Sequence, residues 1–396
     1  MTAVAPGNKA SVLFVSHDAS RTGAPIVLLE FLAWLKEQED ITLTILLRRA
    51  DGDLLTAFES IAPTYRPVFP GKWERRFRKL GASFLGNQEA DVIPEALKSK
   101  SFDLVYLNTV VCLDLAPRLK ELFRCPVICH VHENEYTLHT FYRSHTLPRN
   151  LQPVDHFIAV SESTRQALIG QLSVAYEKIS LVYEFINPER IKTATIAAAD
   201  IKRSLEITSE LIIGGSGIAG WRKGTDWFLQ LGLLLGKLRP GQIKMIWVGE
   251  IGDEIEGQLK YEASRLDIDR HFIFTGTKQQ PQNYFQLFDV FALTSREDPF
   301  PLVAIEAASI KKPVICFDRS GGMAEAISHR QNGLVVPYGD VEAMAAEIIR
   351  ILDNPVLRHQ MGEASGKLAE KYEVRLAGKK LLGIIRQTIN AYPWNR

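Results

Sequence analysis

Strand-like runs of six or seven mostly apolar residues alternate with amphipathic stretches along almost the whole chain. The first group of these runs lies at 11–17, 41–47, 103–108, 126–132, 156–161 and 179–185. After a stretch without such a run, the second group lies at 211–217, 244–250, 271–276, 290–295 and 313–318. Strands that alternate with helical segments are typical of stacked βαβ units around parallel sheets. The pattern therefore predicts an α/β protein with two Rossmann-like domains.

The stretch between the two groups, 187–200, contains a proline and sets the expected domain boundary. We assign residues 1–186 to an N-terminal domain and 187–375 to a C-terminal domain. The last helical stretch, 376–396, is expected to pack back on the N-terminal domain. A chain of 396 residues, 46% of them apolar, is long enough for two cores of ordinary size.

Charge, the N-terminal segment and the cysteines indicate which partners and which compartment to expect. Basic and acidic residues number 47 and 46, so no global field favours nucleic acid as a partner. The N-terminal segment has a five-residue apolar run, too short for a signal peptide or a membrane span, which predicts a cytoplasmic protein. The cysteines lie in or beside strand-like runs and are expected to be reduced core residues. They are Cys112, Cys125, Cys129 and Cys316.

A glycine-rich turn, GGSGIAGWRKGTD, opens the second half of the chain. Its glycines have the G-x-G-x-x-G spacing of dinucleotide-binding turns and are Gly215, Gly217 and Gly220. The helical pattern starts late, with an expected N-cap at 225–226, and no acidic residue follows about 20 positions downstream. These departures disfavour a nicotinamide or flavin site. Arg222 and Lys223 suit a diphosphate beside a helix N-terminus, and an ordinary charged loop is the alternative.

Two acidic residues flank a second expected anion site, after the strand-like run at 290–295. Pro301 is expected at the first helical position, which leaves the N–H groups of Leu302 and Val303 free to bind an anion. Asp298 lies in the preceding loop, and Glu306 lies one turn into the helix on the same face. Carboxylates in these places can bind vicinal hydroxyls of a sugar or ribose. The alternative is a turn residue and a helix-surface residue without a ligand.

The segment TSREDPFPLVAIEAASIKKPVI resembles the E-x7-E segment of retaining, GT-B fold glycosyltransferases of the family 4 type. The likeness is densest from 211 to 340, where GIAGWRKGTDWFL, SGGMAEAI and QNGLVVPYGD resemble successive elements of that family. In the first half, RTGAP resembles the family's donor loop, with Thr22-Gly23 where two glycines are common, and HVHENE resembles its catalytic-site histidine strand. The resemblance implies a GT-B enzyme, in which two Rossmann-like domains face each other across a cleft.

The resemblance also implies which side chains act in the transfer of a sugar from a nucleoside-diphosphate donor. Arg222 and Lys223 would hold the diphosphate, and Glu306 would hold the ribose. The expected catalytic residues are Arg222, Lys223, His132, which would contact the donor sugar, and Asp298, which would contact the transferred sugar. The other residues expected at the donor are Gly23, which would approach the phosphate from the opposing domain, and Gly217, Thr277, Phe300, Pro301, Leu302 and Val303. Asp298 stands where the family usually has glutamate, and adjacent Glu297 is the alternative.

Two short motifs offer metal ligands instead. His130-x-His132 places both rings on one side of a strand, and Glu133 and Glu135 follow, so a metal site is one alternative and a buried structural His130 is another. Asp51-Gly52-Asp53 resembles a D-x-D metal motif, but a turn with a helix N-cap is the expected structure. We expect an enzyme that needs no metal, because Arg and Lys can neutralise the diphosphate.

Residues 72–80, KWERRFRKL, combine an apolar helical face with a basic remainder. Such a helix can lie on an anionic membrane surface, here the inner face of the membrane, or it can be a solvated helix near the acceptor. The sequence thus predicts a retaining glycosyltransferase with a UDP- or GDP-linked donor and a glycan, lipid-linked or small-molecule acceptor, as in polysaccharide biosynthesis. The alternatives are a GT-B nucleotide-sugar epimerase or phosphorylase and, in another class, a nicotinamide-dependent oxidoreductase.

Overall fold

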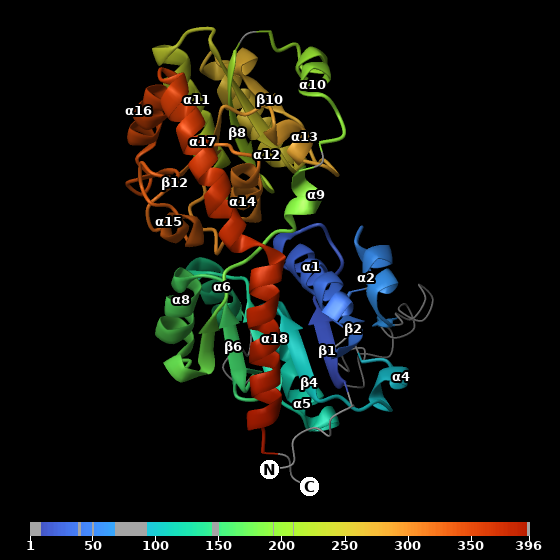
Figure 1. Ribbon diagram of the computed structural model, residues 1–396. Helices are drawn as coiled ribbons and strands as arrows, with labels where there is room; N and C mark the ends of the chain where they lie inside the picture. Colours follow the sequence, from blue (N-terminus) through green and yellow to red (C-terminus); the bar gives the residue numbers. More distant parts are fainter. Residues whose placement is uncertain are drawn as a thin grey trace, which may run out of the picture.

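The chain forms two α/β domains stacked end to end in the computed structural model (Figure 1), which describes residues 9–38, 41–49, 51–67, 93–144, 150–192, 194–208 and 210–393. Each domain is built on one sheet in which every pair of neighbouring strands is parallel. The α/β fold with two Rossmann-like domains, predicted from the alternation of strand-like and helical segments, is therefore confirmed.

The N-terminal sheet has the strand order β3-β2-β1-β4-β5-β6-β7. Its strands are β1 (Ala10–Ser16), β2 (Ile41–Leu47), β3 (Thr64–Tyr65), β4 (Leu104–Asn108), β5 (Val127–Val131), β6 (His156–Ala159) and β7 (Ile179–Leu181). Its helices are α1 (Gly23–Gln38), α2 (Leu55–Ile61), α4 (Glu95–Lys98), η1 (Val110–Leu115), α5 (Ala116–Phe123), α6 (Glu135–Ser144), α8 (Glu162–Leu172) and η2 (Tyr176–Lys178).

The C-terminal sheet has the strand order β10-β9-β8-β11-β12-β13. Its strands are β8 (Leu211–Ser216), β9 (Ile243–Val248), β10 (Phe272–Phe274), β11 (Val290–Leu293), β12 (Val314–Phe317) and β13 (Leu334–Val336). The helices from the domain boundary onward are α9 (Pro188–Lys192), α10 (Ala198–Ser204), α11 (Thr225–Leu238), α12 (Asp253–Arg265), η3 (Asp269–His271), α13 (Gln282–Phe285), α14 (Leu302–Ser309), α15 (Gly322–Ala326), α16 (Val341–Leu352), α17 (Pro355–Ala369), η4 (Glu370–Tyr372) and α18 (Val374–Ala391).

The central strands are apolar along their length because helices cover both faces of each sheet. In β1, residues 12–15 are completely buried, and in β8 the same holds for Ile212 and Ile213. The strand order reverses between β1 and β4 in one sheet and between β8 and β11 in the other. In open α/β sheets, ligands bind beyond the carboxyl ends of strands at such a reversal. The topology therefore directs a ligand to the ends of these strands.

The chain crosses between the domains at two neighbouring points. The N–H of Ile186 donates to the carbonyl of Tyr372 at 2.9 Å, and the N–H of Val374 donates to the carbonyl of Ile186 at 2.9 Å. Beyond this crossing, α18 returns along the N-terminal domain (Figure 1), where a Cβ on Gly378 would lie 2.6 Å from the Trp34 ring of α1. The close packing of α18 on α1 thus requires glycine at this position.

Among the described residues, no helix is long and apolar enough to cross a membrane. The four cysteines are buried and unpaired, as expected for core residues. Burial raises the pKa of the Cys125 thiol to about 12. The basic segment 72–80 lies outside the described residues, so its membrane contact stays a prediction.

Candidate active site

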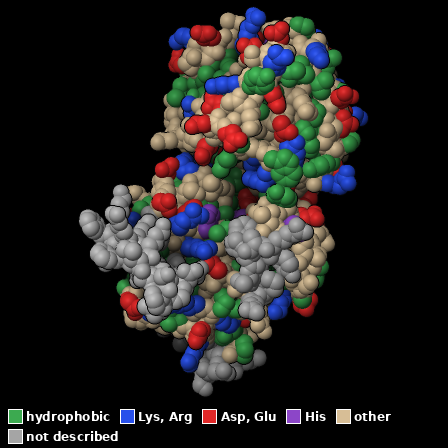
Figure 2. All heavy atoms as spheres, turned by 180° about the vertical axis from the view of Figure 1, so that it is seen from behind, with side chains coloured by type: hydrophobic (Ala, Val, Ile, Leu, Met, Phe, Trp, Pro, Cys, Tyr) green, Lys and Arg blue, Asp and Glu red, His purple; other side chains and the backbone are tan. Residues whose placement is uncertain are grey.

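A cavity of about 610 Å³ lies between the domains. Basic, acidic and histidine side chains gather on the surface where the domains meet (Figure 2). The walls of the cavity come from the segments that follow β1, β4, β8 and β11, the strands at the two strand-order reversals, and from those that follow β2, β5, β7, β9 and β10. Every residue expected at the site from the sequence lines this one cavity; they are Gly23, His132, Gly217, Arg222, Lys223, Thr277, Asp298, Phe300, Pro301, Leu302, Val303 and Glu306. Their individual roles stay predictions.

A buried group of charges lies in the wall of this cavity. Lys223 Nζ forms an ion pair and a hydrogen bond with Asp298 Oδ2, and Arg222 Nη1 lies 3.6 Å from Asp298 Oδ1. The Ser295 hydroxyl donates to Asp298 Oδ2 at 3.2 Å. Burial alone would raise the pKa of Asp298, but the Lys223 ammonium and the Arg222 guanidinium hold this pKa below its ordinary value. The cavity therefore presents a charged carboxylate between two cations.

Lys223, the cation paired with Asp298, is also affected by burial. Burial lowers the pKa of Lys223, while the Asp298 carboxylate opposes that shift. The Lys223 side chain is 12% exposed, whereas that of Arg222 is 40% exposed. Lys223 thus depends on a neighbouring anion, and Arg222 is partly stabilised by solvent.

Two positions of the glycine-rich turn require glycine, because each has a positive φ and a close neighbour where a Cβ would lie. Gly217 has a φ of +133°, and a Cβ there would lie 3.0 Å from the Lys223 side chain. Gly224 has a φ of +63°, and a Cβ there would lie 2.0 Å from the carbonyl oxygen of Thr294. Gly224 is also the N-cap of α11, so the expected N-cap at 225–226 is wrong. Asp226 instead pairs with Arg296 through two hydrogen bonds of 2.8 and 2.6 Å.

Helix α14 begins one residue later than expected. Pro301 is its N-cap, with an extended backbone, and Leu302 is the first helical residue. The first hydrogen bonds of the helix come from Ala304 and Ile305, whose N–H groups donate to the Pro301 carbonyl at 3.0 and 3.4 Å. The start of α14 lines the cavity, and the start of α1 at Gly23 lines it from the opposing domain. Two helix N-termini thus contribute partial positive charge to one cavity.

Glu306 is buried within α14, which excludes the helix-surface alternative. Its Oε1 lies 3.4 Å from Arg190 Nη2, and Arg190 Nε lies 2.7 Å from Glu30 Oε1. Burial raises the pKa of Glu306. Arg190, which the sequence did not single out, therefore connects α1, α9 and α14 beside the cavity.

His132 is held by two hydrogen bonds. Its Nδ1 lies 2.8 Å from Glu184 Oε1, and its Nε2 lies 2.9 Å from Asn108 Oδ1. Because Asn108 Nδ2 donates to the Ala24 carbonyl at 2.9 Å, its amide oxygen faces the histidine and accepts a hydrogen bond from the Nε2–H group. Burial raises the pKa of Glu184. Glu184 was not predicted, because it lies 52 residues away from His132 in the sequence.

His130 has a structural place in the core. Its Nδ1 lies 2.7 Å from the Tyr106 hydroxyl, and burial lowers its pKa well below the ordinary value. Glu133 Oε2 accepts from the backbone N–H groups of His132 and Val110 at 2.9 and 3.4 Å. Within the part of the chain that the structure describes, no three metal-ligating side chains gather at one point. Whether the enzyme needs a metal stays a prediction.

The Asp51-Gly52-Asp53 motif forms a turn at the edge of the cavity. The N–H of Ala19 donates to the Asp51 carbonyl at 3.1 Å, and Gly52 has a φ of +134° with no space for a Cβ. The N-cap of α2 is Leu54 and has no side-chain hydrogen bond, so the expected acidic N-cap is wrong. The turn itself is confirmed.

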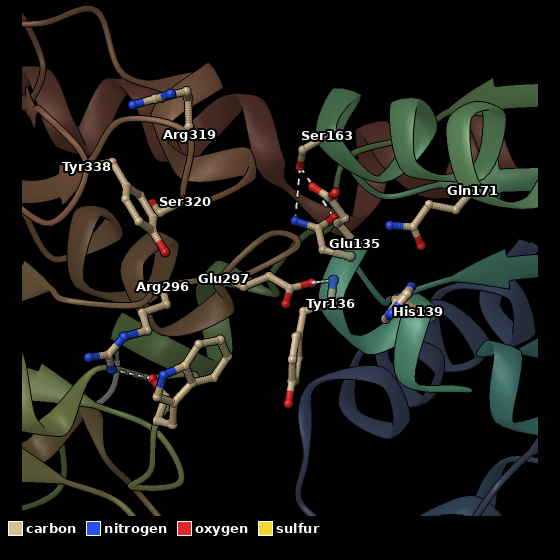
Figure 3. Close-up of a pocket in the computed structure, with 12 residues that line it drawn as sticks. Glu135, Tyr136, His139, Ser163, Gln171, Arg296, Glu297, Arg319, Ser320 and Tyr338 are labelled. Carbon is tan, nitrogen blue, oxygen red and sulfur yellow. Dashed lines mark hydrogen bonds between the residues drawn. The ribbon is translucent and has the colours of Figure 1, made fainter. Parts of the chain in front are cut away.

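Glu297 and Asp298 enter different cavities. Asp298 lines the cavity described above, whereas Glu297 lines a second one and accepts a hydrogen bond from the N–H of Tyr136 at 3.2 Å (Figure 3). The backbone of Asp298 pairs with that of Gly321. The φ of +126° at Gly321 and its lack of a Cβ let these two segments of the chain approach each other. The geometry thus favours Asp298 over Glu297 beside the cationic pair.

Family models match both halves of the chain. Residues 21–190 match the model described as Glycosyltransferase Family 4, and residues 197–368 match the model described as Glycosyl transferases group 1. An uncharacterized glycosyltransferase of Haemophilus influenzae is 28% identical over 164 residues, which are 41% of this chain and 45% of that protein. A D-inositol 3-phosphate glycosyltransferase of Saccharomonospora viridis is 24% identical over 60% of this chain and 57% of that protein. The chain spans about half the length of the curated relatives it matches.

Solved structures share the whole fold. HepE from Anabaena, in complex with UDP and glucose, has a TM-score of 0.78 at 19% identity, over 96% of this chain and 100% of that chain. Sucrose-phosphate synthase from Thermosynechococcus elongatus has a TM-score of 0.73 at 17% identity, over 97% of this chain and 100% of that chain. At these identities the likeness shows the two-domain arrangement alone.

Proposed function

The chain belongs to the family 4, group 1 glycosyltransferases, and on that premise we propose that it transfers a sugar from a nucleoside-diphosphate donor to an acceptor with retention of configuration. The observation that carries the proposal is the buried ion pair of Lys223 and Asp298, with the half-exposed Arg222 beside it, at the start of α14. The cavity volume of about 610 Å³ suits a ligand of nucleotide-sugar size.

In this proposal the diphosphate binds to Arg222, Lys223 and the first N–H groups of α14, while Gly23 approaches it from the opposing domain. A Cβ added to Gly23 would meet no atom of the described residues within 4 Å, which leaves space for a phosphate. Lys223 would exchange its partner Asp298 for phosphate oxygens. Negative charge grows on the diphosphate as the glycosidic bond breaks, so the two cations stabilise the transition state more than the bound donor. These fixed charges support a mechanism without a metal.

Asp298, once released from Lys223, would accept hydrogen bonds from hydroxyls of the transferred sugar. Glu306 would accept from the ribose hydroxyls, because its contact with Arg190 is long and leaves its carboxylate with acceptor capacity. His132, oriented by Glu184 and Asn108, would contact the donor sugar from the N-terminal domain. Closure of the domains would bring donor and acceptor into position and exclude water.

Similar proteins support a UDP-linked sugar as a first choice of donor, with GDP-linked sugars second. HepE is seen with UDP-glucose, and one relative is a poly(ribitol-phosphate) alpha-N-acetylglucosaminyltransferase of Staphylococcus aureus, 24% identical over 65% of this chain and 50% of that protein. The acceptor in our proposal is a glycan or a lipid-linked or small molecule. A peripheral contact of 72–80 with the inner face of the membrane is proposed from its sequence alone.

A thermal-shift screen of UDP, GDP, ADP and their sugars tests the donor site. A ligand at 100 times its dissociation constant adds about 2.7 kcal/mol of stability. We expect one nucleoside diphosphate to stabilise the parent and to lose this effect in Lys223→Met. The matched control is Lys260→Met, because Lys260 is a 63% exposed residue of α12 that lines neither cavity. The proposal fails if no nucleotide stabilises the protein, or if Lys223→Met responds like the control.

A further inference from the structure

A second cavity, of about 590 Å³, is lined by both domains. It lies beside the cavity of about 610 Å³ in which we place the donor, here called the donor cavity. The close-up shows Glu297, Arg296 and Tyr338 on one side and Tyr136, Gln171 and His139 on the other (Figure 3). The two cavities are neighbours because consecutive residues line them in turn. Thr137 lines the donor cavity, and its neighbour Tyr136 lines the second one. In the same way, Asp298 lines the donor cavity and Glu297 lines the second one. A ligand in the second cavity would therefore lie next to the donor.

Exposed aromatic rings line this second cavity. Tyr136 and Trp221 are each 54% exposed, and their ring centroids are 4.8 Å apart. Tyr338, on the same cavity, is 41% exposed. Large aromatic side chains are usually buried, and a group of exposed ones around a cavity marks a recognition surface. The Arg296 guanidinium lies 5.3 Å from the Trp221 ring, and its Nη1 donates to the Trp221 carbonyl at 2.7 Å, which steadies this residue.

Two buried oxygen atoms in the lining have no hydrogen-bond partner among the residues that the structure describes. They are Glu297 Oε2 and Gln171 Oε1, which come from opposing domains. The Glu297 residue is 91% buried, and its other oxygen accepts from the Tyr136 N–H. A buried polar atom without a partner costs stability, and such atoms are uncommon in folded proteins. Both oxygens are acceptors, so a ligand that satisfies them must bring hydrogen-bond donors to both walls.

The charges of the lining disfavour an anionic ligand. Arg296 is already paired with Asp226 through two hydrogen bonds, the exposed Arg319 has its Nε 3.7 Å from Asp318 Oδ2, and Glu297 adds a buried carboxylate. The lining of the second cavity therefore suits a neutral molecule that has apolar faces for the rings and several O–H donors around its edge. A pyranoside meets it, because its C–H face can stack on an aromatic ring while its hydroxyls point outward.

We propose that the second cavity binds sugar residues of the acceptor, stacked on the exposed surface of the Tyr136 and Trp221 ring pair and hydrogen-bonded to Glu297 and Gln171. This assignment rests on the proposed glycosyl transfer and gives its acceptor a chemical class. Because the cavity is formed by both domains, acceptor binding would also favour the closed arrangement of the enzyme.

Saturation-transfer NMR with methyl glycosides of glucose, galactose, mannose and N-acetylglucosamine, in both anomers, tests the assignment. The nucleoside diphosphate that stabilises the protein is present at saturation, so that the donor cavity is filled. We expect at least one glycoside to receive saturation and to bind roughly tenfold more weakly in Trp221→Ala. Gln171→Met, which keeps the side-chain length and removes the acceptor, should weaken the same glycoside.

Tyr261→Ala is the matched control, because Tyr261 is 68% exposed on α12 and lines neither cavity. Its glycoside signal should equal that of the parent. The assignment is overturned if no glycoside receives saturation while the nucleotide still stabilises the protein, or if Trp221→Ala and Gln171→Met bind the glycoside like the parent. Loss of nucleotide stabilisation in the parent would instead refute the proposed function.

Discussion

Replacing Asp298 with asparagine should destabilise the free protein more than replacing Lys223 with methionine. Without Asp298, the buried Lys223 ammonium loses its ion pair, and Arg222 repels it. Without Lys223, Asp298 still has the Arg222 guanidinium at 3.6 Å and the Ser295 hydroxyl at 3.2 Å. Leaving one buried charge uncompensated costs about 3–5 kcal/mol, whereas losing one hydrogen-bond partner costs about 1–3 kcal/mol. The asymmetry follows from the second cation that remains beside Asp298.

Urea denaturation of the parent, Asp298→Asn, Lys223→Met and the double variant measures both costs and their coupling. The nucleoside diphosphate should stabilise Asp298→Asn more than the parent, because phosphate returns an anion to Lys223. The pKa of Asp298 is lowered in the folded protein, so its contribution is present above its unfolded pKa of about 3.9 and is lost as the pH falls through the folded value. Equal stability of Asp298→Asn and the parent, or a larger loss in Lys223→Met, would refute this reasoning.

Three further predictions concern other parts of the molecule. Burial raises the pKa of Glu306, so its contribution to stability is full below an unfolded pKa of about 4.3 and is lost as the pH rises through the folded value. As the pH rises from about 4.3 to neutrality, the free energy of unfolding of Glu306→Gln should therefore increase relative to that of the parent. A difference between the two proteins that does not change with pH would contradict this. Glu325 of α15 accepts from the N–H groups of Glu162 and Ser163 at the start of α8, at 2.8 and 2.7 Å, and so joins the domains. Glu325→Ala should lower the free energy of unfolding by roughly 0.5–1.5 kcal/mol for each bond, because the carboxylate is exposed to solvent, and should enlarge the radius of gyration in small-angle scattering. Glu363→Ala, which removes an exposed ion pair, should leave the radius unchanged, and equal profiles of the two variants would count against the contact. Activity should survive exhaustive chelation, and a loss that manganese restores would show that the enzyme needs a metal.

Most of the fold was predictable because buried parallel strands are continuous apolar runs. The strands that the pattern missed are β3 and β13, which have two and three residues and are too short to show a period. The stretch 187–200 was predicted to lack strands, which is confirmed for its described residues 187–192 and 194–200, but the helices α9 and α10 were not foreseen. They are short helices, of five and seven residues, whose place is set by packing on the C-terminal domain.

The sequence predicted the residues of the donor cavity better than their partners. Lys223 and Asp298 lie in recognisable motifs, but Arg190 and Glu184 carry no local signal, because contacts across 116 and 52 residues depend on the fold. The choice between Asp298 and Glu297 likewise needed the loop conformation, which directs neighbouring side chains into separate cavities. The second cavity was not predicted, since its rings and acceptors come from distant segments of both domains.

Proton NMR of a reaction mixture tests glycosyl transfer most directly. The nucleotide sugar that stabilises the protein is incubated with the methyl glycosides described above, and its anomeric signal is followed with that of the product. Free nucleoside diphosphate should appear in equal amount with a new glycoside of the same anomeric configuration as the donor. Lys223→Met should form this product much more slowly. A product of opposite configuration would contradict retention, and conversion of the sugar without a new glycoside, or a donor that binds and is not consumed, would contradict transfer itself.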